Sequence, residues 1–187
     1  MSRQIYGIHG LCELSEAMCG IVALIACGQP LAERLSVVES MLSRIAHRGP
    51  DGEGVHQVPN QAIFGHRRLA IIDIQQGGQP MLCQNKRYTL VFNGEIYNYI
   101  ELREELEKDG CYFSTSSDSE VLLQSLVHWG ESAIGRLNGM FAFVFHDRVD
   151  NTWIAARDHF GIKPLYYTTI ESELWFASEI KAFFSHP

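Results

Sequence analysis

The stretch Met140-Phe141-Ala142-Phe143-Val144-Phe145-His146 decides the fold class. Because successive side chains of a strand point to opposite faces, the three phenylalanines share one face, while Ala142 and Val144 share the other. Both faces are apolar, whereas a strand with one face in water would alternate apolar with polar residues. This sequence therefore predicts a strand that is buried on both sides.

Other strands are predicted on both sides of this stretch. They lie at residues 20–26, 62–66, 69–74, 88–92, 153–156, 165–167 and 174–177. The segments at 20–26, 153–156 and 165–167 repeat the two-sided apolar character. Residues 75–80 are predicted to form a loop with two glycines.

Helices are predicted in two groups. Apolar residues that recur every three or four positions from Leu31 to Ile45 indicate an amphipathic helix, which a turn at residues 49–52 ends. A charged helix is predicted over residues 100–109, and a second follows the capping-box pattern of Ser117 and Glu120. A further helix is predicted to begin within residues 179–184.

The order of these elements favours an α+β fold. Strands joined by short turns favour antiparallel pairing, and grouped helices disfavour a doubly wound parallel sheet. Strands buried on both faces need a cover on each side, which two sheets packed face to face with outer helices provide. The length of 187 residues suits one domain or two small ones.

Charge and cysteine content exclude several classes of function. A net charge of -7 argues against nucleic acid or an anionic membrane as the main partner, because both need a basic face. The five cysteines are odd in number and include no C-x-x-C, which disfavours a disulfide framework or a zinc site and fits the cytoplasm. No apolar run approaches the roughly 20 residues that span a bilayer.

Cys19 is a candidate nucleophile. If translation starts at Met18 and an aminopeptidase removes it, Cys19 gains a free α-amine. Such an amine has a pKa of about 7.7–8.0, which suits a general base near neutral pH. The thiol and its base would then belong to one residue. The alternative is that Cys19 is a small buried residue at a strand edge.

Asn93 and Gly94 follow the predicted strand at residues 88–92. Attack on an amide creates an oxyanion, which needs two hydrogen-bond donors already aimed at it. The side-chain amide of Asn93 and the backbone N–H of Gly94 could supply them. The alternative is an ordinary Asn-Gly turn, which is common between strands.

Two charged residues are candidates for substrate binding. The Arg68 guanidinium could hold a carboxylate in bidentate fashion, and alternation places Arg67 on the opposite face. Asp118 could bind an ammonium group. Arg68 could instead be a surface arginine, and Asp118 an acid that favours the start of its helix. Carboxamide, carboxylate and ammonium are the three polar groups of free glutamine, and the chain offers a candidate for each.

The chain closely resembles class II glutamine amidotransferase domains of the N-terminal nucleophile hydrolase type, and among them the asparagine synthetases. The shared motifs occur in the family's order across residues 18–187. They are M-C-G-I (18–21), H-R-G-P-D-G (47–52), G-H-R-R-L-A-I-I-D (65–73), N-G-E-I-Y-N (93–98), S-S-D-S-E (116–120), G-M-F-A-F (139–143), R-D-H-F-G-I-K-P-L-Y-Y (157–167) and A-S-E-I-K-A (177–182).

The resemblance implies a fold and a set of roles. It implies a four-layer α/β/β/α sandwich, with Cys19 as nucleophile and its own amine as base. Asn93 and Gly94 would form the oxyanion hole, Arg68 would hold the glutamine carboxylate, and Glu95 and Asp118 would face its ammonium end. No chemistry is assigned to residues 157–163, which would shape the wall toward a second domain. The domain would need no metal or cofactor.

The sequence departs from the family pattern in two ways. Residues 1–17 precede the domain at 18–187 as an extension or propeptide-like segment. They reflect a mis-assigned start, a self-cleaved propeptide or an inactive extended form. There is also no S-G-G-x-D-S loop for ATP pyrophosphate, so the synthetase domain, with its ATP and magnesium, is expected to be absent. The chain would be an isolated domain, a truncated product or one half of a split enzyme.

Two hypotheses of function follow. The first is hydrolysis of L-glutamine to glutamate and ammonia through a thioester, with ammonia passing to a synthetase domain or subunit. The second is a non-catalytic fragment or regulatory module that keeps the fold. The acceptor of the ammonia and the oligomeric state cannot be read from this sequence.

Overall fold

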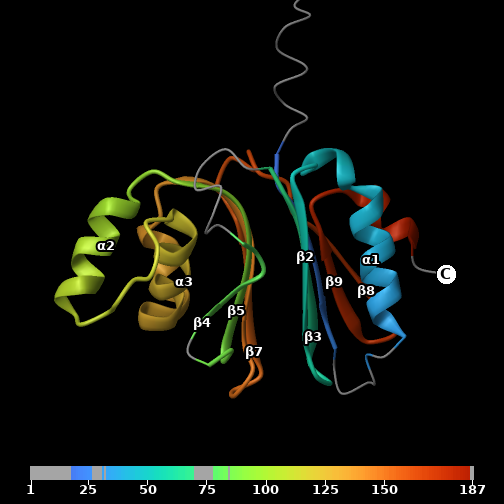
Figure 1. Ribbon diagram of the computed structural model, residues 1–187, viewed down its shortest axis with the longest axis horizontal. Coiled ribbons are helices and arrows are strands. Elements are labelled where there is room, and N and C mark those ends of the chain that lie inside the picture. Colours follow the sequence, from blue (N-terminus) through green and yellow to red (C-terminus); the bar gives the residue numbers. More distant parts are fainter. Residues whose placement is uncertain (1–17, 27–30, 32, 70–77, 84, 186–187) are drawn as a thin grey trace, which may run out of the picture.

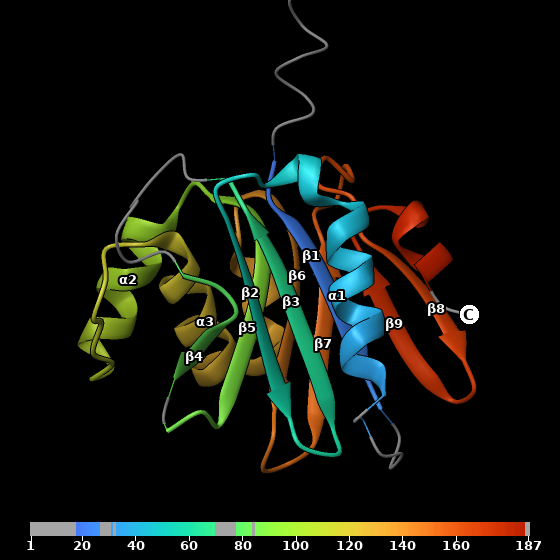
Figure 2. The same ribbon diagram turned by 45° about the vertical axis from the view of Figure 1, so that its right-hand side comes forward.

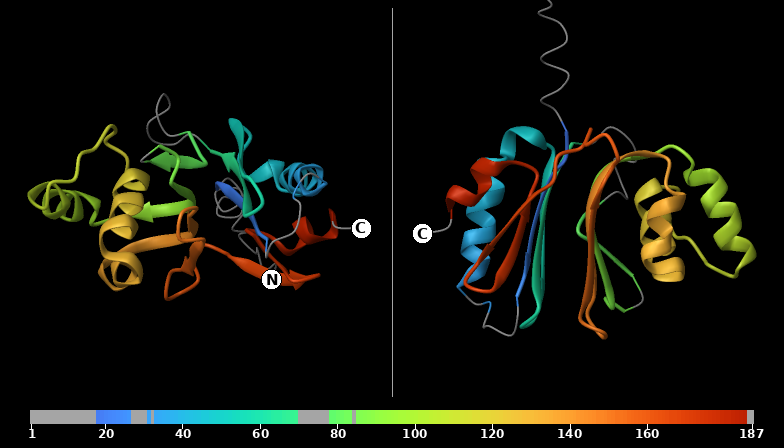
Figure 3. Two further views of the ribbon diagram at one scale, coloured as in Figure 1. Left: turned by 90° about the horizontal axis from the view of Figure 1, so that it is seen from below. Right: turned by 180° about the vertical axis from the view of Figure 1, so that it is seen from behind.

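Four layers form the molecule in the computed structural model, which describes residues 18–26, 31, 33–69, 78–83 and 85–185. Two sheets face each other at the centre. Helix α1 (Arg34–Arg44) lies outside one, and helices α2 (Tyr99–Lys108) and α3 (Asp118–Trp129) lie outside the other (Figure 1). The view from below shows the same stacking (Figure 3). The predicted α/β/β/α sandwich is therefore confirmed.

Within the described residues, the first sheet has five strands in the order β2-β3-β1-β9-β8. Its strands are β1 (Gly20–Ile25), β2 (Gly52–Val58), β3 (Ala62–Arg68), β8 (Tyr166–Ile170) and β9 (Glu173–Ala177). All the strand pairs within it are antiparallel. Helix α1 (Arg34–Arg44) crosses its outer face (Figure 2). The short helices η2 (Ala46–Arg48) and η4 (Ile180–Ser185) complete this half of the fold.

In the part of the chain that the structure describes, the second sheet has four strands in the order β4-β5-β6-β7, again antiparallel. Its strands are β4 (Met81–Cys83), β5 (Tyr88–Ile96), β6 (Gly139–Asp147) and β7 (Thr152–Arg157). This half also contains α2 (Tyr99–Lys108), α3 (Asp118–Trp129) and the short η3 (Gly130–Arg136).

Strand β6 has the two buried faces that its sequence predicts. Phe141, Phe143 and Phe145 pack in the cluster that includes residues of α2 and α3. Ala142 and Val144 pack in the cluster between the sheets, together with residues of β1 such as Ile21 and Ala23. Removing such apolar surface from water is the main driving force for stacking these layers.

Some strand predictions were incomplete or wrong. Strand β5 continues to Ile96, so Asn93 and Gly94 lie within it and do not follow it. β2 and β4 were not predicted. β7 and β8 are edge strands with exposed residues, such as Tyr167, so they are not buried on both faces. The predicted helix near the end of the chain is the short 3-10 helix η4.

The start of α3 only partly matches the predicted capping box. The Ser117 hydroxyl accepts a hydrogen bond from the Glu120 N–H at 3.3 Å. The Glu120 carboxylate instead accepts from the N–H groups of Ser114 and Thr115. It therefore orders the loop before the helix. The extension at 1–17 lies outside the described residues, as does most of the predicted strand at 69–74, whose first residue, Leu69, is not in a strand.

Candidate active site

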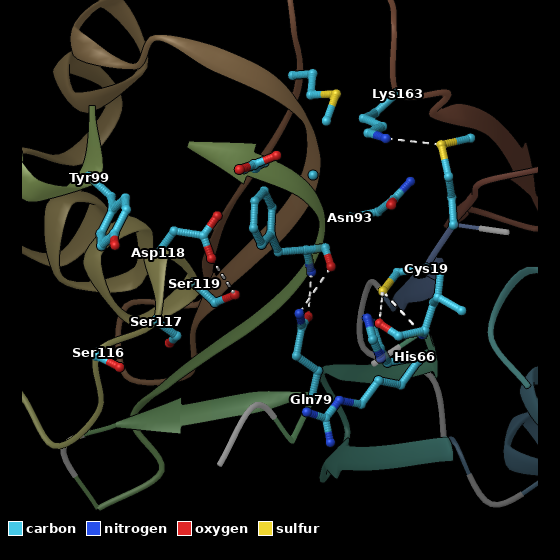
Figure 4. Close-up of a pocket in the computed structure, with 17 residues that line it drawn as sticks. Cys19, His66, Gln79, Asn93, Tyr99, Ser116, Ser117, Asp118, Ser119 and Lys163 are labelled. Atoms are coloured by element: carbon cyan, nitrogen blue, oxygen red, sulfur yellow. Dashed lines mark hydrogen bonds between the residues drawn. The ribbon is translucent and has the colours of Figure 1, made fainter. Parts of the chain in front are cut away.

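A single cavity of about 220 Å³ brings together all six residues predicted for the site. They are Cys19, Arg68, Asn93, Gly94, Glu95 and Asp118. Cys19, His66 and Asn93 gather at one end, and Asp118 lies among Ser116, Ser117 and Ser119 at the other (Figure 4). The cavity therefore has a thiol end and an acidic end, and residues from both halves of the sandwich line it.

Cys19 is held at the entrance to β1 by backbone contacts. Its carbonyl oxygen accepts a hydrogen bond from Arg48 Nε at 3.1 Å, and the Leu69 N–H points to its Sγ at 3.4 Å. Burial raises the pKa of the Cys19 thiol, although the Leu69 N–H and the cations Arg68, Lys163 and Arg48 act in the opposite direction. The thiol therefore needs a base to become a nucleophile at neutral pH.

The strand register directs the Gly94 N–H toward the cavity. Phe92 donates its N–H to Gln79 Oε1 at 2.6 Å, and Ile96 donates its N–H to Asp118 Oδ2 at 3.0 Å. Backbone N–H groups of alternate residues leave the same edge of a strand. Gly94 lies between these two residues, beyond the end of β4, which pairs with β5 only as far as Leu90. Its N–H therefore points to the edge where the cavity lies.

Close packing explains why glycine stands at position 94. A Cβ there would collide with the Met140 carbonyl oxygen and with Phe141 Cα on the neighbouring strand β6. Only glycine lets the two strands approach as they do, which fixes the position of the Gly94 N–H.

Asn93 points to the inner face of the sandwich. Val91, two residues earlier, packs in the cluster between the sheets, so alternation sends the Asn93 side chain the same way. Asn93 is only 2% exposed, and its Nδ2 has no hydrogen-bond partner among the described residues. A buried N–H donor without an acceptor lowers the stability of the fold, unless a bound ligand supplies the acceptor.

Strand β3 sorts its two arginines to opposite faces, as alternation predicts. Arg68 lines the cavity, whereas Arg67 Nε donates to the Leu42 carbonyl of α1 at 3.1 Å and its guanidinium pairs with Glu53. His66 shares the inner face with Arg68 and is 1% exposed. Burial lowers the pKa of His66 to about 4, so its imidazole is neutral and a weak base at neutral pH.

The acidic end is formed by Asp118 and Glu95. Asp118 opens α3, accepts from the Ile96 N–H and is 3.4 Å from the Ser119 hydroxyl. Burial raises the pKa of Asp118, Glu95 raises it further, and the N–H donors partly offset both effects. Two neighbouring carboxylates attract a cationic group into this end of the cavity.

Comparison with known proteins shows which family this chain belongs to. A family model described as "Glutamine amidotransferase domain" matches residues 18–187. The chain belongs to this family. It is 49% identical over 168 residues to asparagine synthetase [glutamine-hydrolyzing] 1 of Bacillus subtilis (strain 168), covering 88% of this chain and 26% of that protein. It is 43% identical over 166 residues to asparagine synthetase [glutamine-hydrolyzing] 2 of Arabidopsis thaliana, covering 88% and 28%.

Two solved structures share the fold of this glutamine amidotransferase domain. The allosteric regulatory enzyme of purine biosynthesis superposes with a TM-score of 0.71 at 26% identity, covering 89% of this chain and 43% of that chain. Glutamine phosphoribosylpyrophosphate amidotransferase from B. subtilis gives 0.73 at 24% identity, covering 89% and 43%. The chain spans about a quarter of the length of the curated relatives it matches.

Several residues that line the amidotransferase cavity were not predicted from sequence, among them His66, Gln79 and Lys163. His66 could have been found, because it lies two residues before Arg68 and must share its face. The side-chain amide of Gln79 donates to the Phe92 carbonyl oxygen through Nε2 and accepts from the Phe92 N–H through Oε1. No sequence pattern indicates this contact. Lys163 was expected to shape a wall toward another domain.

Asp158 holds the loop that carries Lys163. Its carboxylate accepts four backbone N–H groups, from Phe141, Phe160, Ile162 and Lys163. Burial alone would raise the pKa of Asp158, but these four donors outweigh it and the pKa is lowered. The ionised carboxylate therefore stabilises the folded state at any pH above about 3.9, the ordinary pKa of an aspartate. This stabilisation is lost as the pH falls through the lower pKa that Asp158 has in the folded protein.

We expect Asp158→Ala to lower the free energy of unfolding by about 3 kcal/mol at pH 7, because it leaves four N–H groups without an acceptor. Denaturant unfolding measures the loss. The exposed acid Asp150 offers a matched control, since its carboxylate pairs with Arg87 at the surface. A loss at position 158 no larger than that of Asp150→Ala would contradict the role assigned to the four hydrogen bonds.

The structure was also searched for metal sites and membrane spans. Within the described ranges, no group of three or more His, Cys, Asp or Glu residues could hold a metal ion. No helix in the same residues is long and apolar enough to cross a membrane.

Proposed function

We propose that this domain hydrolyses L-glutamine to glutamate and ammonia through a thioester on Cys19, once Cys19 is the first residue. The observation that supports this most strongly is the single cavity that holds a thiol, an unpartnered amide donor, an arginine and two carboxylates. These groups match the carboxamide, carboxylate and ammonium of one glutamine molecule.

The proposed reaction begins with proton transfer from the Cys19 thiol to its own α-amine. The sulfur attacks the side-chain carbonyl carbon of glutamine, and the amine returns the proton to the departing nitrogen, which leaves as ammonia. Water then cleaves the thioester and releases glutamate. The rival base, His66, is poorly suited because burial lowers its pKa to about 4.

Asn93 Nδ2 and the Gly94 N–H would stabilise the oxyanion of both tetrahedral steps. We expect Asn93→Ala to lower kcat by about 100-fold and to change KM much less, because these donors act mainly on the transition state. Steady-state glutamate release measures both constants. Asn93→Asp keeps the size of the side chain but removes the donor, so it should lose as much; full activity of either folded variant would contradict this role.

Arg68 would hold the α-carboxylate of glutamine, and Asp118 with Glu95 its ammonium. Because the pKa of Asp118 is raised, its charge is lost at a higher pH than for an ordinary aspartate. We expect KM to rise as the pH falls through the raised pKa of Asp118. Asp118→Asn should raise KM about 10–100-fold at pH 7, and its KM should depend less on pH. Asp109→Asn, at a surface pair with His128, is the matched control. An unchanged KM for Asp118→Asn would refute the assignment.

The ammonia acceptor would belong to an asparagine synthetase-type partner. The relatives of this chain are named asparagine synthetase [glutamine-hydrolyzing], and they are more than three times its length. We propose that a synthetase domain or subunit, using ATP and magnesium, receives the ammonia. The thiols of Cys19, Cys83 and Cys111 are free, which supports the proposal that the protein is located in the reducing cytoplasm.

The test is direct. A purified chain that begins at Cys19 is mixed with L-glutamine, and glutamate and ammonia are measured. Equal amounts of the two products support the proposal. A folded chain with a free amino-terminal cysteine that releases neither would overturn it and would favour the alternative of a non-catalytic module that keeps the fold.

A further inference from the structure

Lys163 lines the cavity and reaches the Met18–Cys19 segment. It is 7% exposed and lies on the loop between β7 and β8, next to Asp158 in space. Its Nζ lies 2.9 Å from Met18 Sδ (Figure 4). The ammonium group is therefore aimed at the residue whose removal would free the Cys19 amine.

This ammonium group has an unusual environment. Lysine is almost never buried unless it is paired. Among the described residues, no carboxylate forms an ion pair with Lys163, and the one hydrogen bond of its ammonium group is to the Met18 thioether. The carboxylate nearest in sequence, Asp158, already accepts four backbone N–H groups. A buried, weakly paired cation in a cavity suggests a functional role more than a structural one.

Charged groups from several elements surround Cys19 and Lys163. The cations that act on Cys19 are Arg48 of η2, Arg68 of β3 and Lys163, and the carboxylates that act on Lys163 are Glu95 of β5 and Asp158. Arg48 is committed to Glu179 at 3.0 Å and to the Cys19 carbonyl oxygen. Lys163 is the cation whose ammonium group contacts Met18, the residue directly before the Cys19 nitrogen.

We propose that the Lys163 ammonium keeps the Cys19 α-amine unprotonated at neutral pH, which makes Lys163 a positioning residue for the general base. Two neighbouring ammonium groups repel each other, so the amine binds a proton less readily. Burial lowers the pKa of Lys163 as well, with a further contribution from Arg48, while Cys19, Glu95 and Asp158 act to raise it. This inference rests on the proposed glutaminase activity.

The test compares three chains that begin at Cys19: the unchanged chain, Lys163→Met and Lys163→Arg. The pH dependence of kcat/KM reports the ionisation of the free enzyme. We expect the acid limb of the profile to move up by about 1 pH unit in Lys163→Met, with activity recovering at high pH. Lys163→Arg keeps the charge, so its acid limb should stay in place.

The outcomes separate this inference from the proposed function. An inactive unchanged chain counts against the glutaminase activity itself. If the unchanged chain is active and Lys163→Met has its acid limb at the same pH, the proposed role of Lys163 is overturned and the glutaminase activity is not. A loss of activity that is equal at every pH also overturns it, because a structural role alone would lower the rate without moving the limb. Thermal unfolding of each variant confirms that the compared chains are folded.

Discussion

Replacing Cys19 with alanine is expected to lower kcat for glutamate release by at least about 10⁴-fold in a chain that begins at residue 19, because no other group in the cavity can form the thioester. Cys19 is the only cysteine among the described residues that lines the cavity. The remaining donors could still bind glutamine, so KM or the dissociation constant should change much less than kcat. Steady-state kinetics and calorimetric binding measure the two effects.

Two matched variants sharpen this prediction. Cys111→Ala removes a half-buried thiol that lies 3.9 Å from His128 Nδ1, away from the cavity, and should leave kcat unchanged. Cys19→Ser keeps the free amine and nearly the same shape but offers a poorer nucleophile, so it should retain only a trace of activity. Substantial turnover by Cys19→Ala would mean that the chemistry occurs without the thiol, and the proposed mechanism would be wrong.

The layers of the fold could be predicted because a central strand that is buried on both faces carries apolar residues on both faces. β1 and β6 sit between other strands and between layers, so both of their faces are apolar and visible in the sequence. β7 and β8 are apolar in sequence but lie at sheet edges, where neighbours cover them on one side only. Position in the sheet depends on long-range pairing, which a local pattern does not encode.

Strands with weak patterns escaped prediction for a related reason. β2 contains two glycines and alternates between exposed and partly exposed residues, and it exists because it pairs along its whole length with β3. β4 has only three residues. A prediction from local sequence has little to use in either segment.

The sequence predicted which residues line the cavity better than it predicted how they are oriented. Strand alternation alone correctly separates Arg68 from Arg67. The direction of the Gly94 N–H instead follows from the register of β5 against β6 and from the contacts of Phe92 and Ile96, which are visible only in three dimensions. Lys163 illustrates the same limit, because its place near Met18 arises from a contact between residues 145 positions apart in sequence.

A chain that retains Met18 is expected to be at least about 10³-fold less active than the same chain beginning at Cys19, since it loses its general base and part of its cavity. While Met18 is present, the nitrogen of Cys19 belongs to a peptide bond and cannot accept a proton. Met18 itself lines the cavity, with its sulfur against Lys163. Both effects oppose turnover, and neither requires a change in the fold.

The measurement uses one preparation in two states. A chain beginning at Met18 is assayed before and after digestion with methionine aminopeptidase, and intact mass gives the fraction that begins at Cys19. Activity should rise in proportion to that fraction, while the thermal unfolding midpoint stays nearly constant. If the undigested chain were equally active, the base would have to be a group other than the α-amine. His66 would then be the first residue to replace, because its Nε2 is buried in this cavity without a partner among the described residues.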